Sequence, residues 1–471
     1  MSFSTIAAIA TPIGSAGIGI IRISGENAIT IAQSVFRKPI SDKDNASVLS
    51  LKAIEGFESH LLYHGFIVDP QSGLMIDEVL LSVMQAPHSY TREDVVEINS
   101  HSGSVLLGKI LDLVLKQGAR MADPGEFTKR AFINGRIDLT QAEAVMDIIT
   151  ARTDKAMEVA STHLRGDFKV QIESMRNILL QISTDLEAAI DFPDDVGDVY
   201  EPDVMIHHIE KHIIVPLRRL LDHYQHAHIF RDGLVLAVVG KPNVGKSSLM
   251  NRLLQKDRVI VSEIPGTTRD YIEETANIHG IPIIIADTAG LHETEDPVEA
   301  MGIMKTREYI SGADLILFVI DASCPLSEAD YLIYDAVKDK NVILVFNKSD
   351  LYPSDADFER PETWTRLPQA IISARYGSGL DELKCLIATI ATGDSKLDVR
   401  NTIVPNLRHK QALDRCYEAA SAVLEGMRTQ LSVDLIALDL QDAVAALDEI
   451  IGLRTKDWIL DQIFDRFCVG K

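Results

Sequence analysis

The chain has 471 residues, of which 46% are hydrophobic, and a formal net charge of −23. This length favours more than one domain, and the apolar content argues against long disordered segments. Such an acidic chain repels nucleic acid over most of its surface, so an RNA contact has to be local or come from a basic partner. The four cysteines form no C-x-x-C pair, so neither a zinc site nor a disulfide framework is indicated, and a reducing cytoplasm fits.

Residues 1 to about 134 have the pattern of a mixed domain rich in strands. A helix is predicted over 105–115. Short apolar or alternating runs predict strands over 5–10, 17–24, 79–86 and 95–99. The apolar first 21 residues lack the basic start of a signal peptide, and Pro12 interrupts them, so two strands fit better. No stretch is long and apolar enough to span a bilayer, which predicts no membrane anchor.

Three polar side chains stand out in this region. Arg22 interrupts the apolar run 18–23, where a buried cation is costly unless it is paired. Glu97 lies in a V-V-E-I strand, and Arg136 follows an Asn-Gly pair. From spacing alone, an ion pair between Arg22 and Glu97 in the core is favoured over a ligand site.

From residue 138 to about 191 the pattern turns helical, with apolar residues at three- and four-residue spacing. A further helical stretch covers 194–231, and three more helical runs follow residue 400. The clearest of these ends at Gly452, a predicted C-cap. Helices on both sides of the central segment can pack into one bundle, so the sequence favours an inserted segment.

Residues 232–393 alternate short apolar strands with helical runs, which is typical of a doubly wound parallel α/β sheet. The strand 234–239 leads into 240–247, which fits G-x-x-x-x-G-K-[ST] at every fixed position. Glycines let backbone N–H groups approach phosphates, and the following helix adds partial positive charge. Lys246 would reach the β- and γ-phosphates, and the Ser247 hydroxyl would bind Mg²⁺. The alternative is a glycine-rich turn without a ligand.

Two strand-end motifs accompany this phosphate loop. In D-T-A-G, Asp287 would reach the Mg²⁺ shell and the Gly290 N–H the γ-phosphate. In N-K-S-D, Asp350 can accept two hydrogen bonds from guanine N1 and N2, which adenine cannot offer. Ser373 and Ala374 follow the next strand, where they would support the guanine O6. The predicted nucleotide is therefore GTP.

The motif G-T-T-R-D over 266–270 lies where a Mg²⁺-sensing switch belongs. One of its threonines, Thr267 or Thr268, would bind Mg²⁺ only when a γ-phosphate is present. Hydrolysis poses a separate question, because Leu291 stands where Ras-like enzymes carry a water-positioning glutamine. Either an outside activator completes a slow switch or catalytic groups lie elsewhere. Acidic residues such as Glu299 follow, and by pattern alone they form a solvated loop.

Four further stretches resemble the MnmE (TrmE) family of tRNA modification GTPases, within the TrmE-Era-EngA-YihA-Septin-like GTPases. They are I-R-I-S-G at 21–25, P-G-E-F at 124–127, D-F-P at 191–193 and F-C-V-G-K at 467–471. The C-terminal Cys-x-Gly-Lys is the most specific, with Val469 in place of the family's usual isoleucine. The resemblance covers essentially the whole chain and implies a multidomain α/β protein.

The implied layout is a Ras-like doubly wound G domain inserted in an all-helical domain and preceded by an α+β folate-binding domain. Residues 1–134 would bind tetrahydrofolate and form the dimer, and 232–393 would be the GTPase domain. The two parts of the helical domain would be 135–231 and 394–471, the second ending in Cys-x-Gly-Lys.

The resemblance also implies a site for formyl- or methylene-tetrahydrofolate. Arg22, Glu97, Arg136 and Lys471 match the family's folate-contacting positions, although the family often has lysine in place of Arg136. On this interpretation Arg22 would face a ligand as well as a core partner. Cys468 would be a nucleophile or site thiol near the one-carbon unit, or else a packed cysteine without chemistry.

In the G domain, Asn243 matches the family's potassium ligand, and Ser262, Ile264 and Thr267 would complete the shell. A K⁺ there can replace an arginine finger, because it places positive charge where negative charge builds up.

Thr268 matches the Mg²⁺-binding switch threonine, and Glu299 the catalytic glutamate that orients the attacking water. Glu299 would thus answer the question raised by Leu291, with Lys246 as a second catalytic residue. The implied GTP-binding residues are Asn243, Val244, Gly245, Lys246, Ser247, Ser248, Ser262, Glu263, Ile264, Pro265, Gly266, Thr267, Thr268, Asp287, Thr288, Ala289, Gly290, Asn347, Lys348, Asp350, Ser373, Ala374 and Arg375.

A reaction and a partner follow from the same resemblance. A cytoplasmic homodimer would work with the flavoprotein MnmG, in a heterotetramer, on the wobble uridine of certain tRNAs. It would add a carboxymethylaminomethyl or aminomethyl group to carbon 5, with the methylene carbon coming from the folate. GTP hydrolysis would drive domain motion, and tRNA would bind mainly through MnmG.

Two other functions remain open on the sequence. A ribosome-assembly, RNA-binding GTPase of the Era or Der type shares the G domain and the missing glutamine. Such proteins usually append a basic RNA-binding domain, which this sequence does not show. The other alternative is a scaffold that binds GTP without turnover.

Overall fold

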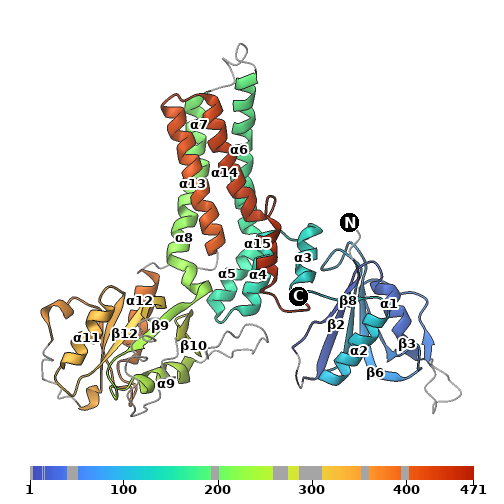
Figure 1. Ribbon diagram of the computed structural model, residues 1–471, viewed down its shortest axis with the longest axis horizontal. Coiled ribbons are helices and arrows are strands. Elements are labelled where there is room, and N and C mark those ends of the chain that lie inside the picture. The colour runs from blue at the N-terminus through green and yellow to red at the C-terminus, as the bar shows by residue number, and fades with distance from the viewer. Residues whose placement is uncertain are drawn as a thin grey trace. The chain divides into compact units, whose positions relative to one another are not determined.

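The computed structural model describes residues 4–12, 14, 16–39, 51–191, 201–257, 274–285, 310–351, 360–393 and 402–471. Its contacts divide the chain into two compact units (Figure 1). The first contains Met1–Glu143 and Gly452–Lys471, and the second contains Ala144–Ser262 and Thr268–Ile451. The last residues of the chain thus pack with the N-terminal part, whereas the sequence grouped them with the second helical segment.

The first unit is built on an eight-stranded sheet with the strand order β4-β3-β5-β6-β7-β2-β1-β8. Its strands are β1 (Ile6–Ile9), β2 (Ile18–Ser24), β3 (Phe36–Pro39), β4 (Leu51–Ala53), β5 (Leu61–Val68), β6 (Met75–Met84), β7 (Val95–His101) and β8 (Arg120–Met121). Neighbouring strands are antiparallel, except that β1 and β8 are parallel.

Two helices, α1 (Ala28–Val35) and α2 (Ser104–Lys116), share a buried apolar core with one face of this sheet. Ile21 and Ile23 of β2 enter that core. Because successive strand residues point to opposite faces, Arg22 lies on the other face of the sheet.

The C-terminal residues pack on helix α3 (Glu126–Ile133), which precedes α4 (Leu139–Thr150). Helix α15 (Asp457–Phe464) contacts α3, and Lys129 forms an ion pair of 2.7 Å with Asp461. Gly125 has a φ of 66°, and a Cβ on it would lie 2.6 Å from the carbonyl oxygen of Phe464. This close approach of two backbones therefore requires glycine.

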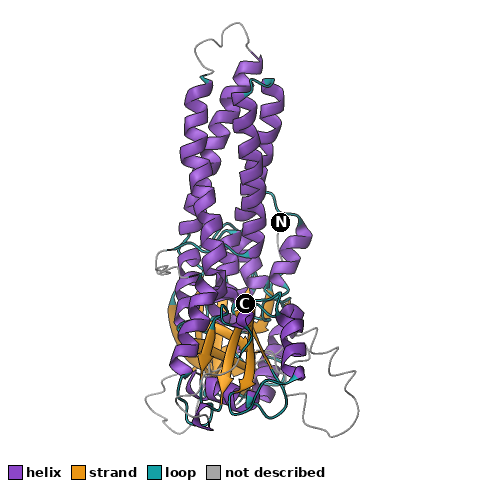
Figure 2. Ribbon diagram, turned by 90° about the vertical axis from the view of Figure 1, so that its left-hand side faces the viewer, coloured by secondary structure: helices purple, strands orange, loops and turns teal. Residues whose placement is uncertain are grey.

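Helices from both sides of the central segment of the second unit share one apolar core. Those before it are α6 (Asp167–Asp191), α7 (Pro202–Ile209), the π-helical turn η2 (Glu210–Ile214) and α8 (Val215–Asp232); those after it are α13 (Leu407–Arg428) and α14 (Val433–Ile451). Helix α5 (Asp154–Leu164) contacts α6 and α8, but its Val159 belongs to the core of the six-stranded sheet. Ile172 of α6, Leu217 of α8, Leu413 of α13 and Leu447 of α14 are completely buried there. Figure 2 shows this bundle as long helices.

The central segment forms a six-stranded sheet with the order β10-β11-β9-β12-β13-β14. Its strands are β9 (Leu234–Val239), β10 (Glu274–Ile278), β11 (Ile281–Ile285), β12 (Leu315–Asp321), β13 (Val342–Asn347) and β14 (Gln369–Ile371). They are parallel except for β10, which pairs antiparallel with β11. The carboxyl ends of five parallel strands therefore meet at one edge, where ligands bind in such sheets.

Helices cover both faces of this sheet. Helices α9 (Lys246–Asp257) and α12 (Leu380–Thr392) share one core with it, and α11 (Glu328–Val337) belongs to the core on the other face. Among the described segments, none of the helices combines the length and the apolar character needed to cross a bilayer.

Candidate functional site

The phosphate loop follows β9, the strand next to β12 in the middle of the sheet. Gly240 and Gly245 have φ values of 152° and 97°. A Cβ on Gly245 would lie 2.2 Å from the side-chain nitrogen of Asn347, and one on Gly240 would lie 2.3 Å from the carbonyl oxygen of Val319. Only glycine fits both positions, so the glycines of the motif are required by packing as well as by phosphate binding.

The ammonium group of Lys246 lies against this loop. It donates hydrogen bonds to the carbonyl oxygens of Gly240 at 2.9 Å and of Lys241 at 2.7 Å. Helix α9 begins at Lys246, so the first N–H groups of the helix, which have no partner within it, belong to the same loop. Positive charge and backbone donors thus converge where phosphates would bind.

Asn347 joins the phosphate loop to the loop predicted to hold guanine. Its side chain is buried, its Nδ2 donates to the carbonyl oxygen of Val244 at 2.7 Å, and its Oδ1 accepts the N–H of Ala374 at 2.9 Å. Through these two hydrogen bonds, the asparagine of N-K-S-D positions the phosphate loop and the loop after β14 relative to each other.

The predicted guanine contacts lie together at the ends of β13 and β14. The hydroxyl of Ser373 donates to Asp350 Oδ1 at 2.5 Å. Lys348 forms an ion pair of 2.6 Å with Asp321, the last residue of β12. Burial alone would raise the pKa of Asp321, but hydrogen bonds from Lys348 and Ser323 hold it below its usual value.

Sequence reasoning missed two residues of this site. Asp321 ends a buried strand beside β13, and that position was a usable signal. Arg252 of α9 donates to the carbonyl oxygens of Ala374 at 3.2 Å and Arg375 at 2.6 Å. Arg252 thus stabilises the backbone of the loop after β14, which is predicted to contact guanine. It belongs to no sequence motif.

The other predicted G-domain residues divide into two groups. Asn243, with a φ of 63°, is exposed in the phosphate loop, and Ser247 and Ser248 are exposed in the first turn of α9. The rest lie outside the described residues: Ser262, Glu263, Ile264, Pro265, Gly266, Thr267, Thr268, Asp287, Thr288, Ala289, Gly290 and Glu299.

In the first unit, Arg22 and Glu97 are direct cross-strand partners on β2 and β7. Arg22 Nε donates to Glu97 Oε1 at 2.8 Å, and the two side chains are 18% and 22% exposed. The ion pair predicted from spacing is therefore present, at the margin of the core. A second guanidinium nitrogen of Arg22 donates to the carbonyl oxygen of Gly470 at 3.1 Å.

Two backbone hydrogen bonds hold the C-terminal segment to the start of α3. The N–H of Gly125 donates to the carbonyl of Cys468 at 3.4 Å, and that of Phe127 donates to Lys471 O at 3.1 Å. The Phe127 ring also lies 5.6 Å from the Arg22 guanidinium. The fold thus brings the backbone of residues 468–471, more than 300 residues away in sequence, to the start of α3, and the carbonyl of Gly470 to Arg22.

Arg136 is not part of this hydrogen-bonded group. It is exposed, and its guanidinium lies 4.8 Å from the ring of Tyr90. Tyr90 and Phe127 pack on the same small apolar cluster. Arg136 and Arg22 therefore flank one cluster, each against a different aromatic ring.

A buried charge cluster explains the glutamate of P-G-E-F. Arg130 is 1% exposed and forms ion pairs with Glu93 at 3.0 Å and with Glu126 at 2.7 Å. Arg120 adds a second guanidinium to Glu126. Although burial opposes it, these bonds lower the pKa of Glu126. The cluster fixes the first turn of α3, to which the C-terminal segment binds.

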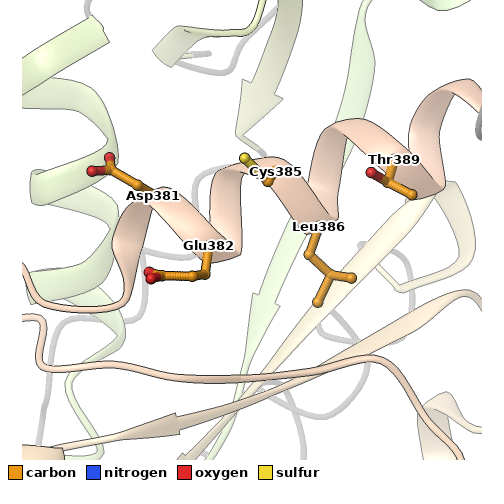
Figure 3. A pocket seen from close by; sticks show the side chains of 5 residues that line it. All are labelled: Asp381, Glu382, Cys385, Leu386 and Thr389. Carbon is orange, nitrogen blue, oxygen red and sulfur yellow. The ribbon is translucent and has the colours of Figure 1, made fainter. Parts of the chain in front are cut away.

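A groove of about 510 Å³ lies elsewhere, along one side of α12. Figure 3 shows its lining residues Asp381, Glu382, Cys385, Leu386 and Thr389 on successive turns of that helix. None of the predicted site residues lines it, so it is separate from the nucleotide site.

Comparison with known proteins gives the chain's relatives. The family description "GTP-binding protein TrmE N-terminus" matches residues 5–136, and "MnmE helical domain" matches residues 139–468. Proteins named "tRNA modification GTPase MnmE" from Carboxydothermus hydrogenoformans and Thermoanaerobacter sp. are 44% and 45% identical, each over 100% of both chains. The protein of that name from Moorella thermoacetica is 44% identical over 99% of both chains. Both domain descriptions and full-length identity agree, and the chain belongs to the MnmE family of tRNA modification GTPases.

Proposed function

We propose that this chain is a potassium-dependent GTPase that works with the flavoprotein MnmG on tRNA. The product would be a carboxymethylaminomethyl or aminomethyl group on carbon 5 of the wobble uridine of certain tRNAs. The observation that carries the proposal is the group formed by Arg22, Glu97 and the carbonyl of Gly470. This group lies outside the G domain, and GTP hydrolysis alone does not require it. The names of the relatives support tRNA as the substrate.

The group around Arg22 has the chemistry of a pterin site. It combines a half-buried guanidinium, a carboxylate and a backbone carbonyl, which suit a ring with both donors and acceptors. When bound there, formyl- or methylene-tetrahydrofolate would supply the one-carbon unit. Arg22 and Glu97 would orient the ring, Arg136 and Lys471 would hold the anionic end, and Cys468 would lie near the transferred carbon.

Calorimetry with formyl-tetrahydrofolate tests this site. We expect Arg22→Gln and Glu97→Gln to weaken binding about tenfold or more, because each leaves the other charge unpaired. Arg92→Gln is the matched control, since Arg92 donates to the carbonyl of Asn134 on the exposed surface. Unchanged folate affinity in both variants would refute the site.

The phosphate site proposed in the G domain is supported by the loop after β9, which contains Asn243 and leads into the first turn of α9 at Lys246. When bound, Mg²⁺ and K⁺ would neutralise charge that develops on the transferred phosphoryl group. Ser247 and Thr268, with Asp287 behind them, would hold Mg²⁺. Residues holding K⁺ would be Asn243, Ser262, Ile264 and Thr267. Glu299 would orient the attacking water.

The cation dependence can be measured directly. We expect GTP hydrolysis to be faster in K⁺ than in Na⁺, and Asn243→Ala to abolish that difference. Glu299→Ala should slow hydrolysis in both salts while GTP still binds. Equal slow rates in K⁺ and Na⁺ for the wild type would instead favour a scaffold that binds GTP without turnover.

The same proposal includes the assembly. The protein would be a cytoplasmic homodimer formed through residues 1–134, with the G domain inserted in the helical domain. It would form a heterotetramer with MnmG. Nucleoside mass spectrometry of tRNA from cells lacking this protein separates it from a ribosome-assembly GTPase of the Era or Der type. Loss of the modified wobble uridine supports the proposal. Normal levels of the modified wobble uridine, together with defective ribosomal subunits, would support the alternative.

A further inference from the structure

Lys241, the second residue of the phosphate loop, reaches across to the start of α11. Its ammonium nitrogen lies 2.7 Å from Asp330 Oδ2 and 2.9 Å from Ser327 Oγ. Asp330 is completely buried, whereas the Lys241 side chain is 24% exposed. An ion pair thus links the phosphate loop to α11, which packs against β12.

Asp330 is held firmly in place on its own helix. Its Oδ2 accepts the N–H of Ser327 at 2.8 Å and the Ser327 hydroxyl at 2.9 Å, which closes a capping box at the helix start. A buried carboxylate is costly unless it is paired, and Lys241 is the cation that pairs with it. The ion pair therefore fixes Lys241 to a carboxylate that is itself held in place.

The backbone of Lys241 also contacts the phosphate-binding lysine. Its carbonyl oxygen accepts the hydrogen bond from Lys246 Nζ at 2.7 Å. One residue thus connects the buried carboxylate of α11, through its side chain, to the ammonium of Lys246, through its main chain. A shift of the Lys241 backbone would move a group that has to meet the β- and γ-phosphates.

As a member of a GTPase family, the chain hydrolyses GTP, and we propose that Lys241 is a positioning residue for that reaction. Its ion pair with Asp330 holds the phosphate loop in the geometry that orients Lys246. Lys241 needs no contact with the nucleotide to do this. A purely structural role would lower stability without changing nucleotide affinity.

The test uses the full chain and compares Lys241→Met with the double variant Lys241→Met/Asp330→Asn. The double variant removes the buried carboxylate's unpaired charge while asparagine can still accept the Ser327 N–H. We expect both to raise the Kd for GTP about tenfold and to lower kcat, since small displacements of catalytic groups have effects of this size or more. Unfolding midpoints should fall in the single variant and recover in the double variant.

Lys338→Met is the matched control, because Lys338 pairs with Asp335 on the exposed end of the same helix. Its Kd should equal that of the wild type. Wild-type Kd and kcat in Lys241→Met, or their recovery in the double variant, would overturn the proposal. If the single variant does not fold, the double variant decides alone. Neither readout involves tRNA or folate, so the result is independent of the proposed modification chemistry.

Discussion

The side-chain amide of Asn347 donates to the carbonyl oxygen of Val244 across 2.7 Å, and so links the end of β13 to the phosphate loop. The same side chain accepts the N–H of Ala374. The phosphate and base subsites therefore share one buried residue, and a change there should affect both.

We predict that Asn347→Ala lowers GTP affinity and the stability of the G domain together. It leaves the Val244 carbonyl and the Ala374 N–H unpaired, each at a cost of about 1–3 kcal/mol. Nucleotide titration and thermal unfolding measure the two effects. Asn341→Ala is the control, because the Asn341 amide makes one long, exposed bond to Asp314. Normal affinity in Asn347→Ala would argue against a shared residue.

We predict that Gly470→Ala abolishes folate binding and leaves GTP hydrolysis unchanged. Gly470 has a φ of 97°, and a Cβ would lie 2.5 Å from the carbonyl oxygen of Ile9, so the C-terminal segment has to move and its carbonyl leaves Arg22. Calorimetry and a GTPase assay measure the two activities. Val469→Ala, at an exposed neighbour, should bind folate normally. Full folate binding by Gly470→Ala would separate this segment from the site.

The Asp321–Lys348 pair predicts a pH dependence. Folding lowers the pKa of Asp321, so the pair's contribution is present above the unfolded pKa of about 3.9 and is lost as the pH falls through the folded pKa. Asp321→Asn should therefore be less stable than the wild type at pH 7, and the difference should shrink as the pH falls below about 4.

Urea unfolding followed by tryptophan fluorescence checks this pH dependence. In a Trp458→Phe background the buried Trp364, in the core beside β12, is the sole tryptophan and reports on this sheet alone. Asp335→Asn, which removes an exposed pair, is the control. A stability difference between Asp321→Asn and the wild type that stays constant with pH would contradict the prediction.

We predict that Arg130→Met destabilises the first unit by about 3–5 kcal/mol, because it leaves Glu93 without its cation and Glu126 with Arg120 alone. Hydrogen exchange in β1 and β7, measured by mass spectrometry, should speed up accordingly. Lys129→Met on the same helix removes an exposed pair with Asp461 and should cost about 1 kcal/mol or less. Similar exchange in the two variants would mean that the buried cluster contributes little.

Local pattern accounts for much of the fold. Alternation predicted β1, β2 and β7, and helical spacing predicted α2 within a residue or two. Strands β3 to β5 were missed, since they are short or mix polar with apolar residues. The sequence pattern predicts one helical region over 194–231, whereas the described part of this stretch contains α7, the π-helical turn η2 and α8.

The site divides in the same way. Asn347, Lys246 and Arg22 stand in motifs or break a pattern, so the sequence marks them. The carbonyl of Gly470 beside Arg22 is a contact between residues 448 positions apart, and the position of Arg252 behind the guanine loop depends on how α9 packs. Neither contact can be predicted from the local pattern of a single sequence. The switch residues and Glu299 stay predictions.

The shared core of α6–α8 with α13 and α14 has a consequence for biosynthesis. Arg176 of α6 and Asp448 of α14, which form an ion pair, are separated by 272 residues. On a ribosome that adds about 5–20 residues per second, the first helices emerge many seconds before their partners exist. Their apolar faces must stay exposed while the whole β9–α12 segment is made, and that interval is when a chaperone would be needed most.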